Sequence, residues 1–576
     1  MRTFLKSSVN SLTIRRFSSY TYLNLAQFLG ALNDNIYKLL IVYFFIELEG
    51  AENSHIILSM SGALFVLPFI LFSATSGMLA DRFSKRNIII ATKVFEVLIM
   101  LAGVFSFYFH LKWGLFAVLF LLATHSAIFA PSKYGILPEI VSHDKIAKAN
   151  GVMSSFTFLA IIVGTFFASF ILDITDRNFL LAGGLCTAFS LIGFLASICI
   201  EYTEPAGSEK KFDPLFFKEI FEALKVAKEH PSLLTAVFGS AFFLFLGAFV
   251  QLNIIPYALQ SLYLSDVQGG YLFLLTALGI GTGSLMAGKI SGKTVELGLV
   301  PLAGIGVALS CFLLDYFSVH LIAVIPLVLF LGFAGGLYQI PMDSYIQVAS
   351  PAKGRGQIVA ATNFLSFIGV FAASAMVFVV GEVLGLPADK GFTIVGGFAL
   401  FITAIISWQF FDYACRLACF ILSRLHFQMV FFGLKNIPDE PVVYVLKHRA
   451  WNDTLILLGA QRRRVAFFIE QEKPHSKLAK RLYGLLRIYY IESTPSAQDT
   501  ATMRACLDKG MSVAVLIEGE DVVKEIEALK ADENLQKEES ITFIPVVIDT
   551  GEKETQSPLF ARFLKKIRVP AAVSFG

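Results

Sequence analysis

The sequence predicts an all-α membrane domain followed by a small cytosolic α/β domain, and three observations lead to this prediction. Hydrophobic residues make up 56% of the 576 residues and charged residues only 16%, whereas soluble domains average about 25% charged residues. Apolar segments long enough to cross a bilayer recur as far as residue 411. Beyond residue 437, short apolar strands alternate with helical patterns, which is typical of a layered α/β domain.

Twelve segments of the sequence are candidates for membrane-spanning helices. A helix that crosses the hydrocarbon core, which is about 30 Å thick, needs about 20 mostly apolar residues. The segments that meet this condition are 22–47, 56–80, 88–109, 112–131, 152–173, 179–200, 232–262, 268–290, 298–316, 319–341, 357–382 and 391–411.

The distribution of Lys and Arg predicts how these segments are oriented. Basic residues gather in alternate loops, for example at 15–16, 82–86, 145–148 and 210–218. Because short loops rich in Lys and Arg stay in the cytoplasm, we expect the amino terminus to be cytoplasmic. An even number of crossings returns the chain to the same side, so the region 415–576 is expected there as well.

The membrane domain, 1–414, is expected to consist of two six-helix halves. The longest polar loop of this region, 201–231, falls between the sixth and seventh segments and divides halves of about 20–200 and 232–414. The motif Leu29-Gly30-Ala31-Leu32 of the first segment is echoed by Leu246-Gly247-Ala248-Phe249 of the seventh. Such short echoes are typical of transporters that are built from parallel repeats.

Several polar residues lie at membrane depth, where they are costly and mark functional sites. We expect them to face a cavity between the two halves; the alternative for Asp34 is an internal ion pair with Lys38 that serves packing only. The candidates for the cavity are Asn33, Asp34, Asn35, Lys38, Gln251, Asn253, Gln339 and Asp343.

The loop after the second segment carries the most specific motif of this half. It reads Gly77-Met78-Leu79-Ala80-Asp81-Arg82-Phe83-Ser84-Lys85-Arg86, and it resembles the loop signature of the major facilitator superfamily, with Ser84 where a glycine is usual. A basic loop that obeys the topology rule alone is the alternative. The resemblance implies a gate in which Asp81 pairs with an Arg or with helix ends. The gating residues are Gly77, Asp81, Arg82, Lys85 and Arg86.

Two further stretches, 28–35 and 130–139, resemble the lysophospholipid transporter branch of that superfamily. The resemblance implies inward flipping of a lysophosphatidylethanolamine-like lipid across the inner membrane of a bacterial cell. The alternative is a facilitator for another amphiphile or a drug, with proton coupling through Asp34. The net charge of +3 gives no indication of nucleic-acid binding, and the six scattered cysteines give none of a metal site.

The cytosolic region, 438–576, contains a histidine five residues before an aspartate, His448 and Asp453. The strand 442–446 ends just before this histidine, and the aspartate opens the next helical pattern, 454–460. An aspartate can fix the tautomer of an imidazole, which then acts as a general base toward a hydroxyl group. A hydrogen-bonded core histidine is the alternative. Further strands are expected at 465–469, 488–491, 513–517, 541–548 and 567–573, and helices at 476–486 and 500–508.

Glu518-Gly519 after one strand and Ile544-Pro545-Val546-Val547 in a later one resemble, in this order, the glycerolipid acyltransferases. The resemblance implies an O-acyltransferase that acts on 2-acylglycerophosphoethanolamine or 1-acylglycerol-3-phosphate. It makes His448 the base and Asp453 its partner, with Glu518, Gly519 and Pro545 at the substrate. Acyl-carrier protein or coenzyme A thioesters would donate the acyl chain, and no bound cofactor is implied.

The sequence departs from that family in two places. Glu520-Asp521 replaces the usual Thr-Arg, whose Arg binds phosphate, and like charges do not substitute for that contact. Members of that family usually continue beyond the final strand, so a truncated domain is one interpretation of this sequence. An inert acyltransferase domain joined to a transporter is therefore an alternative to a bifunctional protein of lysophospholipid salvage. Residues 415–437, aromatic and basic, are expected to lie along the membrane surface as a linker.

Overall fold

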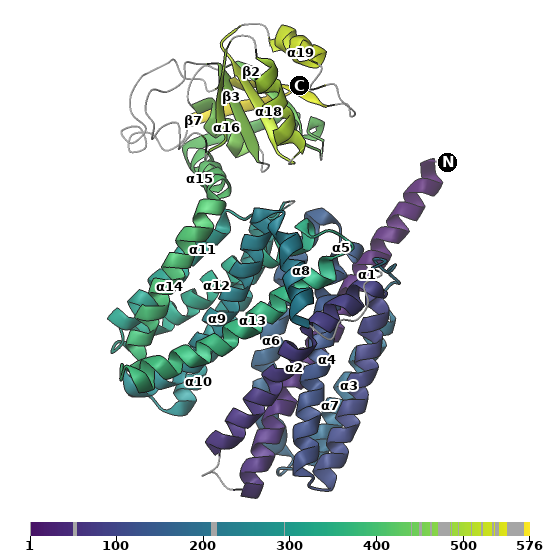
Figure 1. Cartoon of the computed structure of the whole chain (residues 1–576), viewed down its shortest axis with the longest axis vertical. Helices are drawn as coiled ribbons and strands as arrows, with labels where there is room; N and C mark the ends of the chain where they lie inside the picture. Colours follow the sequence, from purple (N-terminus) through teal and green to yellow (C-terminus); the bar gives the residue numbers. More distant parts are fainter. Residues whose placement is uncertain are drawn as a thin grey trace. The chain divides into compact units, whose positions relative to one another are not determined.

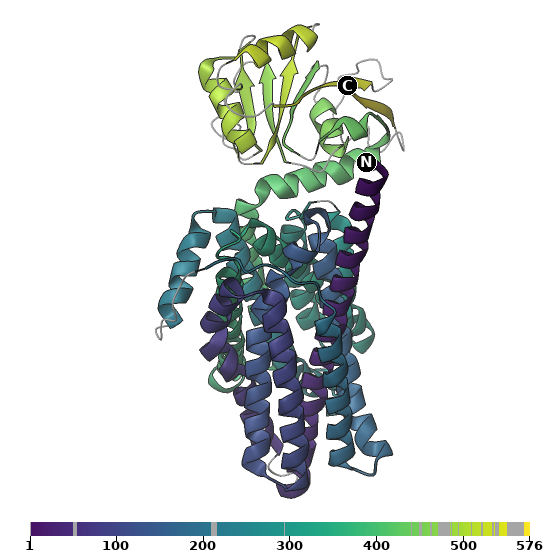
Figure 2. The same ribbon diagram turned by 90° about the vertical axis from the view of Figure 1, so that its right-hand side faces the viewer.

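The computed structural model divides the chain into two compact units, Met1–Gln409 and Phe410–Gly576 (Figures 1 and 2). Each unit is described by itself. The structure describes residues 2–49, 54–208, 216–292, 294–438, 440–447, 452–460, 464–470, 484, 486–492, 495–508, 510–519, 522–532, 535, 541–549 and 569–576.

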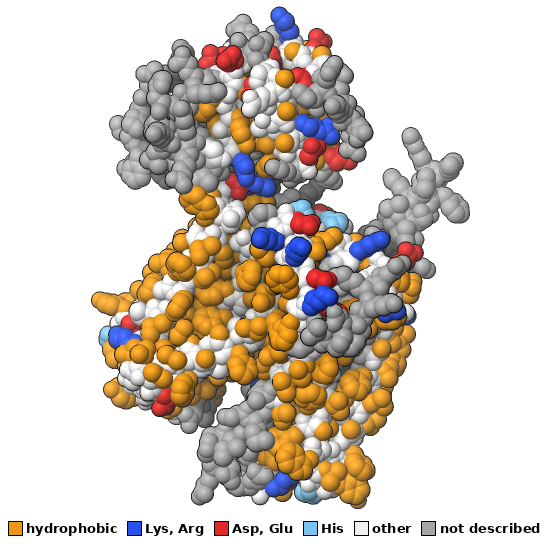
Figure 3. All heavy atoms as spheres, in the orientation of Figure 1, with side chains coloured by type: hydrophobic (Ala, Val, Ile, Leu, Met, Phe, Trp, Pro, Cys, Tyr) orange, Lys and Arg blue, Asp and Glu red, His pale blue; other side chains and the backbone are white. Residues whose placement is uncertain are grey.

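The first unit is helical throughout. Among its described residues, eleven helices are long and apolar enough to cross a membrane, and the first predicted segment, 22–47, lies inside α1. Apolar side chains cover the sides of these helices, whereas Lys and Arg gather at one end of the unit (Figure 3). The helices are α1 (Arg2–Glu49), α2 (Ser54–Arg82), α3 (Lys85–Tyr108), α4 (Lys112–Gly135), α5 (Leu137–Ile140), α6 (Ile146–Ile174), α7 (Phe179–Ile198), α8 (Phe216–Lys228), α9 (Pro231–Gln260), α10 (Asp266–Ser291), α11 (Leu299–Tyr316), α12 (Leu321–Ala349), α13 (Arg355–Phe378) and α14 (Ala388–Gln409), with short turns η2 (His143–Lys145) and η3 (Val379–Val383).

Each half has its own apolar core, which is buried among α1, α3, α4, α6 and α7 in the first half and among α9 to α14 in the second. Glycines let helices of one half approach closely. A Cβ on Gly283 of α10 would lie 2.8 Å from the carbonyl carbon of Phe333 on α12, and one on Gly336 would lie 2.6 Å from the Ser284 nitrogen. Small residues at such crossings are how helices gain packing energy where lipid supplies no hydrophobic driving force.

The second unit is a seven-stranded sheet in the order β1-β7-β6-β2-β5-β3-β4. Neighbouring strands are parallel except for β6 and β7, which are antiparallel. The strands are β1 (Phe427–Phe432), β2 (Val443–Lys447), β3 (Val465–Glu470), β4 (Ile488–Ile491), β5 (Ser512–Ile517), β6 (Phe543–Asp549) and β7 (Val569–Phe575). The helices are α15 (Phe411–His426), α16 (Asn452–Ala460), α18 (Ala497–Asp508) and α19 (Val522–Ala531), with a short turn η4 (Leu434–Asn436).

Alternate residues of the central strand β2 pack against opposite helical layers. Tyr444 and Leu446 join the core beneath α16, whereas Val443 and Val445 join the core beneath α18 and α19. Side chains point alternately to the two faces of a strand, so a strand that is apolar at every position belongs in the middle of such a three-layer arrangement.

The segment 415–437 differs from its prediction as a linker on the membrane surface. Its first part lies in helix α15 and its second part forms strand β1, which pairs in parallel with β7 from Phe427↔Val569 to Phe432↔Ser574. The partner strand is far away in the sequence, so the apolar run of β1 was read as a continuation of the amphipathic helix before it. The segment belongs to the α/β unit, which begins at Phe410 rather than at residue 438.

Candidate functional site

Buried carboxylates of both halves of the first unit are held by serine hydroxyls. In the amino-terminal half, Ser126 of α4 donates a hydrogen bond of 2.8 Å to the Oδ2 atom of Asp34 on α1. In the carboxy-terminal half, Ser240 of α9 donates one of 2.8 Å to the Oδ1 atom of Asp343 on α12. The Lys133 ammonium group of α4 lies within electrostatic reach of both carboxylates.

A cavity of about 110 Å³ adjoins this group. Tyr134 of α4 lines it from the first half, and Ser240, Gln339 and Asp343 line it from the second. The Gln339 amide donates to both carboxylate oxygens of Asp343, at 2.8 and 2.7 Å. The cavity therefore offers the Asp343 carboxylate to a ligand, and the residue before Tyr134 on α4 is Lys133.

The structure places the other predicted cavity residues elsewhere. Asn33 is fully buried inside the first half, where its amide donates to the Cys186 carbonyl at 2.9 Å. Asn35 bonds to the Ala31 carbonyl of its own helix. Asn253 bonds to the Ala388 carbonyl inside the second half.

Two more of the predicted cavity residues lie away from the shared group of charges. Gln251 is exposed. The Lys38 ammonium lies 5.4 Å from the centre of the Phe65 ring, and Asp34 bonds to Ser126, so these two residues do not form the packing ion pair that was the alternative for Asp34.

Sequence reasoning missed a buried charged cluster in the first half. The Lys93 ammonium lies 2.5 Å from the Glu96 carboxylate on α3, and the Nε2 atom of His125 on α4 lies 3.4 Å from the same carboxylate. All three side chains are at most 2% exposed. The signal was present in the sequence, because ionisable residues inside apolar segments are rare enough to be singled out.

The predicted gate residue Asp81 joins the two halves at the end of α2. Its carboxylate accepts backbone N–H groups of Gly356, at 2.7 Å, and Gln357, at 3.0 Å, at the start of α13. The amino terminus of a helix presents unpaired N–H groups and a partial positive charge. A Cβ on Gly77 would lie 2.8 Å from the Gly356 carbonyl oxygen, so this glycine is what lets α2 and α13 come together.

The basic gate residues hold the loop within the first half. Lys85 forms an ion pair of 2.6 Å with Glu139 of α5. Arg86 donates to the carbonyl groups of Ile198 and Ile200, both at 3.1 Å. Arg82 is exposed and lies beside the Phe83 ring.

Other contacts between the halves lie at the same end of the unit. Asn150, near the start of α6, donates to Ser344 and Gln347 near the end of α12, both at 3.0 Å. The helices of the two halves diverge toward the opposite end (Figure 1). The halves are therefore joined at the Asp81 end, which the basic loops predict to be the cytoplasmic end.

We expect Asp81→Asn to open the cytoplasmic end. The amide of asparagine keeps only one of the two oxygen acceptors of the carboxylate. Losing a hydrogen bond to a charged group costs about 1.5–3 kcal/mol, which shifts the ratio of closed to open molecules by roughly tenfold or more. The measurement is the labelling of an Asn363→Cys variant, in a background without native cysteines, by an impermeant maleimide from the cytoplasmic side. Asp144→Asn, at an exposed aspartate, is the matched control. Unchanged labelling would mean that Asp81 does not hold the gate.

In the second unit, the predicted catalytic residues follow the carboxyl end of the central strand. β2 ends at Lys447, which pairs with Ile517 at the end of β5, and ligands of open parallel sheets bind at such edges. Asp453, in the first turn of α16, is 4% exposed. His448 lies outside the described residues, as do Glu520 and Asp521.

The predicted substrate residues of this unit lie on the two neighbours of β2. Glu518 follows β5, and its backbone N–H donates to the Glu470 carboxylate at 2.8 Å. Gly519 comes next and is exposed. Pro545 of β6 pairs with Val445. Partial burial and the nearby Glu470 charge raise the pKa of Glu525 on α19, so this edge of the sheet is acidic.

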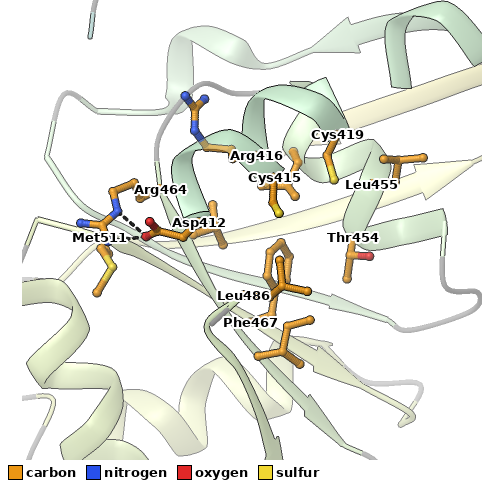
Figure 4. Close-up of a pocket in the computed structure, with 13 residues that line it drawn as sticks. Asp412, Cys415, Arg416, Cys419, Thr454, Leu455, Arg464, Phe467, Leu486 and Met511 are labelled. Atoms are coloured by element: carbon orange, nitrogen blue, oxygen red, sulfur yellow. Dashed lines mark hydrogen bonds and ion pairs between the residues drawn. The ribbon is translucent and has the colours of Figure 1, made fainter. Parts of the chain in front are cut away.

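An apolar cavity of about 230 Å³ lies between α15, α16 and strands β3 and β4 (Figure 4). Cys415 and Cys419 of α15 line it opposite Thr454 and Leu455 of α16. The Nε atom of Arg464 donates to Asp412 at 3.0 Å at its edge.

We expect the two thiols of this cavity to react slowly. Burial raises the pKa of Cys415 and of Cys419, because apolar surroundings favour the neutral thiol, and only the thiolate is nucleophilic. Alkylation by iodoacetamide near pH 8, followed by mass spectrometry, should be several-fold slower at both than at exposed Cys199. It should accelerate as the pH rises. Equal rates at all three cysteines would show that the cavity is open to solvent.

Comparison with known proteins places the first unit. The sequence profile of the Major Facilitator Superfamily matches residues 23–374. The chain is 27% identical over 399 residues to the lysophospholipid transporter LplT of Enterobacter sp. (strain 638), covering 67% of this chain and 94% of that protein. It is 28% identical over 396 residues to LplT of Klebsiella pneumoniae (strain 342), covering 66% of this chain and 94% of that protein.

Solved structures agree on the fold alone. The human organic anion transporter TETRAN, at 15% identity, superposes with a TM-score of 0.58 over 68% of this chain and 99% of that one. The Escherichia coli fucose:proton symporter, at 13% identity, superposes with a TM-score of 0.56 over 67% of this chain and 98% of that one. These matches cover about two thirds of the chain.

Proposed function

We propose that this chain, which belongs to the major facilitator superfamily, carries lysophospholipids such as lysophosphatidylethanolamine from the outer to the inner leaflet of a bacterial inner membrane. The observation that carries the proposal is a group of three charges from both halves: Asp34 bonded to Ser126, Asp343 bonded to Ser240, and Lys133 within electrostatic reach of both carboxylates. A phosphoethanolamine head group has a phosphate for the lysine and an ammonium for a carboxylate. The similarity to lysophospholipid transporters supports this substrate class.

The contacts at the cytoplasmic end support the proposed direction. Asp81 holds α13 and Asn150 holds α12, so among the described residues the halves are joined at the predicted cytoplasmic end, and we infer that the lipid enters from the side on which they diverge. Rocking of the halves would then expose the same group to the other side, as in transporters built from repeats.

The test is uptake of labelled lysophosphatidylethanolamine by proteoliposomes that contain the purified full chain. Lipid that has reached the inner leaflet is protected from extraction by albumin added outside. We expect protection to rise with time in these vesicles and not in vesicles without protein. Protection of another labelled amphiphile, with none of lysophospholipid, would support the alternative of a facilitator for a different substrate.

We also propose that the second unit re-acylates the lipid, with acyl-carrier protein or coenzyme A thioesters as donors. Three features support this: the buried carboxylate of Asp453 in the first turn of α16, the apolar cavity beside α16, which has room for part of an acyl chain, and the acidic edge around Glu470 and Glu518. That edge suits the ammonium of an ethanolamine head group better than a bare phosphate. Joining both steps in one chain raises the concentration of the intermediate at the enzyme.

A further inference from the structure

Another cavity of the first unit lies at the Asp81 end and has no part in the lipid site described above. Its volume is about 400 Å³, which is within the range of roughly 300–1,000 Å³ that small-molecule sites have. The first half contributes Glu139 of α5, the segment 201–206 after α7 forms one wall, and the second half contributes Ala352 and Arg355. A ligand in this cavity would therefore touch both halves.

The wall formed by the segment after α7 is held against the first half at both ends. The backbone N–H group of Glu201 donates a hydrogen bond of 3.0 Å to the Ser19 hydroxyl. The backbone N–H group of Ser208 donates one of 3.3 Å to the Asp81 carbonyl. The segment therefore has a defined place, and so do the side chains that it presents to the cavity.

The charges that line the cavity favour a cation. Among the described residues, three carboxylates line it, those of Glu139, Glu201 and Glu204, together with the guanidinium of Arg355. Lys85 donates to the Oε1 atom of Glu139 at 2.6 Å, whereas the Oε2 atom of Glu139 is buried and accepts no hydrogen bond in the described part of the chain. Carboxylates in excess over cationic groups in a recess attract positive ligands.

Thr203 is an independent indication that this cavity takes a ligand. Its side chain is only 8% exposed, and it lines the cavity between Glu201 and Glu204. The Oγ1 atom is buried and has no hydrogen-bond partner among the residues that the structure describes. Buried polar groups of native proteins are nearly always hydrogen-bonded, so this hydroxyl is one that a ligand with N–H or O–H groups can satisfy.

The arrangement of the carboxylates distinguishes between kinds of cation. Within the described ranges, no group of three His, Cys, Asp or Glu side chains is placed to hold a metal ion. A linear polyamine carries ammonium groups that are separated by short apolar chains, so each of them can reach a different carboxylate. The exposed Tyr202 also lines the cavity, and the face of an aromatic ring attracts an ammonium group.

We propose that this cavity binds a linear polyamine from the cytoplasm, and that the bound polyamine holds the two halves together at the Asp81 end. Its ammonium groups donate hydrogen bonds to Glu201, Glu204 and the Thr203 hydroxyl, and no covalent bond is made or broken. A ligand that touches both halves only while this end is closed shifts the equilibrium toward the closed state. The inference goes beyond the proposed transport, because it adds a regulatory ligand.

Calorimetric titration of the purified full chain with the triamine spermidine tests the site, with MgCl₂ and NaCl at the same ionic strength as controls. We expect saturable binding of spermidine, which Glu201→Gln should weaken by about tenfold. Glu204→Gln, at the exposed rim, should weaken it by up to about fivefold. Thr203→Val should weaken it several-fold although it changes no charge. Glu229→Gln, at an exposed glutamate outside the cavity, should not.

Labelling of an Asn363→Cys variant by an impermeant maleimide measures the effect on the halves, because Asn363 lines the central cavity. Spermidine should slow the labelling from the cytoplasmic side several-fold, and Glu201→Gln should remove most of this effect. Neither measurement needs a lipid, so a failure here leaves the proposed transport standing.

Three results would each overturn the inference. Spermidine binding that is unchanged in both Glu201→Gln and Thr203→Val would show that the triamine only screens surface charge. Binding of Mg²⁺ that is as tight as that of spermidine and is weakened by the same variants would assign the cavity to a metal ion. Binding of spermidine without slower labelling at Asn363→Cys would show that the ligand does not hold the halves together.

Discussion

Replacing His448 by alanine is expected to lower acyl transfer by about 10²–10⁴-fold, which is the usual contribution of a general base, while lipid uptake stays unchanged. The histidine follows the carboxyl end of β2, and Asp453 begins the next helix as a buried carboxylate. An aspartate in that place holds the imidazole in the tautomer whose free nitrogen takes the proton of the attacking hydroxyl.

The measurement is the formation of diacyl product from labelled lysophosphatidylethanolamine, with acyl-carrier protein and coenzyme A thioesters tried separately. Asp453→Asn should also lower the rate, because an amide does not stabilise the imidazolium. Asp508→Asn, at an exposed aspartate of α18, should not. Normal acylation by His448→Ala would show that another group is the base. No product from the wild type with either donor would mean that the second unit is an inert appendage.

Much of the fold could be predicted because the signals are local. A run of about 20 apolar residues predicts a membrane crossing wherever it occurs. The strands β2, β3, β4 and β5 coincide with short apolar runs that end in polar or turn residues. β1 escaped prediction because a strand of this kind is defined by its partner. Phe427 pairs with Val569, and no window of the sequence contains both residues.

The central site was predicted only in part, because hydropathy does not show which face of a helix points inward. Asp34 and Asp343 stand out as charges at membrane depth, and in the structure both lie within electrostatic reach of Lys133. Asn33 and Asn253 carry the same signal yet lie inside their own halves. Lys133 was not singled out, because α4 continues to Gly135, beyond the apolar segment that predicted it.

Replacing Lys133 by methionine is expected to lower lysophospholipid transport by about 30-fold or more. Removing one partner of a desolvated charge pair typically costs about 2–5 kcal/mol, and in the proposed complex that pair is the Lys133 ammonium and the lipid phosphate. Lys133 also lies within electrostatic reach of Asp34 and Asp343. The phosphate would lose its partner while Asp34 and Asp343 would face it unopposed. The measurement is the initial rate of uptake in proteoliposomes. Lys390→Met, at the exposed partner of Asp315, is the matched control.

Comparing the uptake of two lipids with different head groups distinguishes recognition of the lipid by these charges from a purely structural role. If Asp343 holds the ammonium, Asp343→Asn should lower uptake of lysophosphatidylethanolamine more than uptake of lysophosphatidylglycerol, which has no ammonium. Lys133→Met should lower both, because both carry the phosphate. If Asp343→Asn lowered the uptake of both lipids equally, that carboxylate would serve the movement of the halves instead. A residue that only sets the conformational equilibrium changes the uptake of every substrate by the same factor.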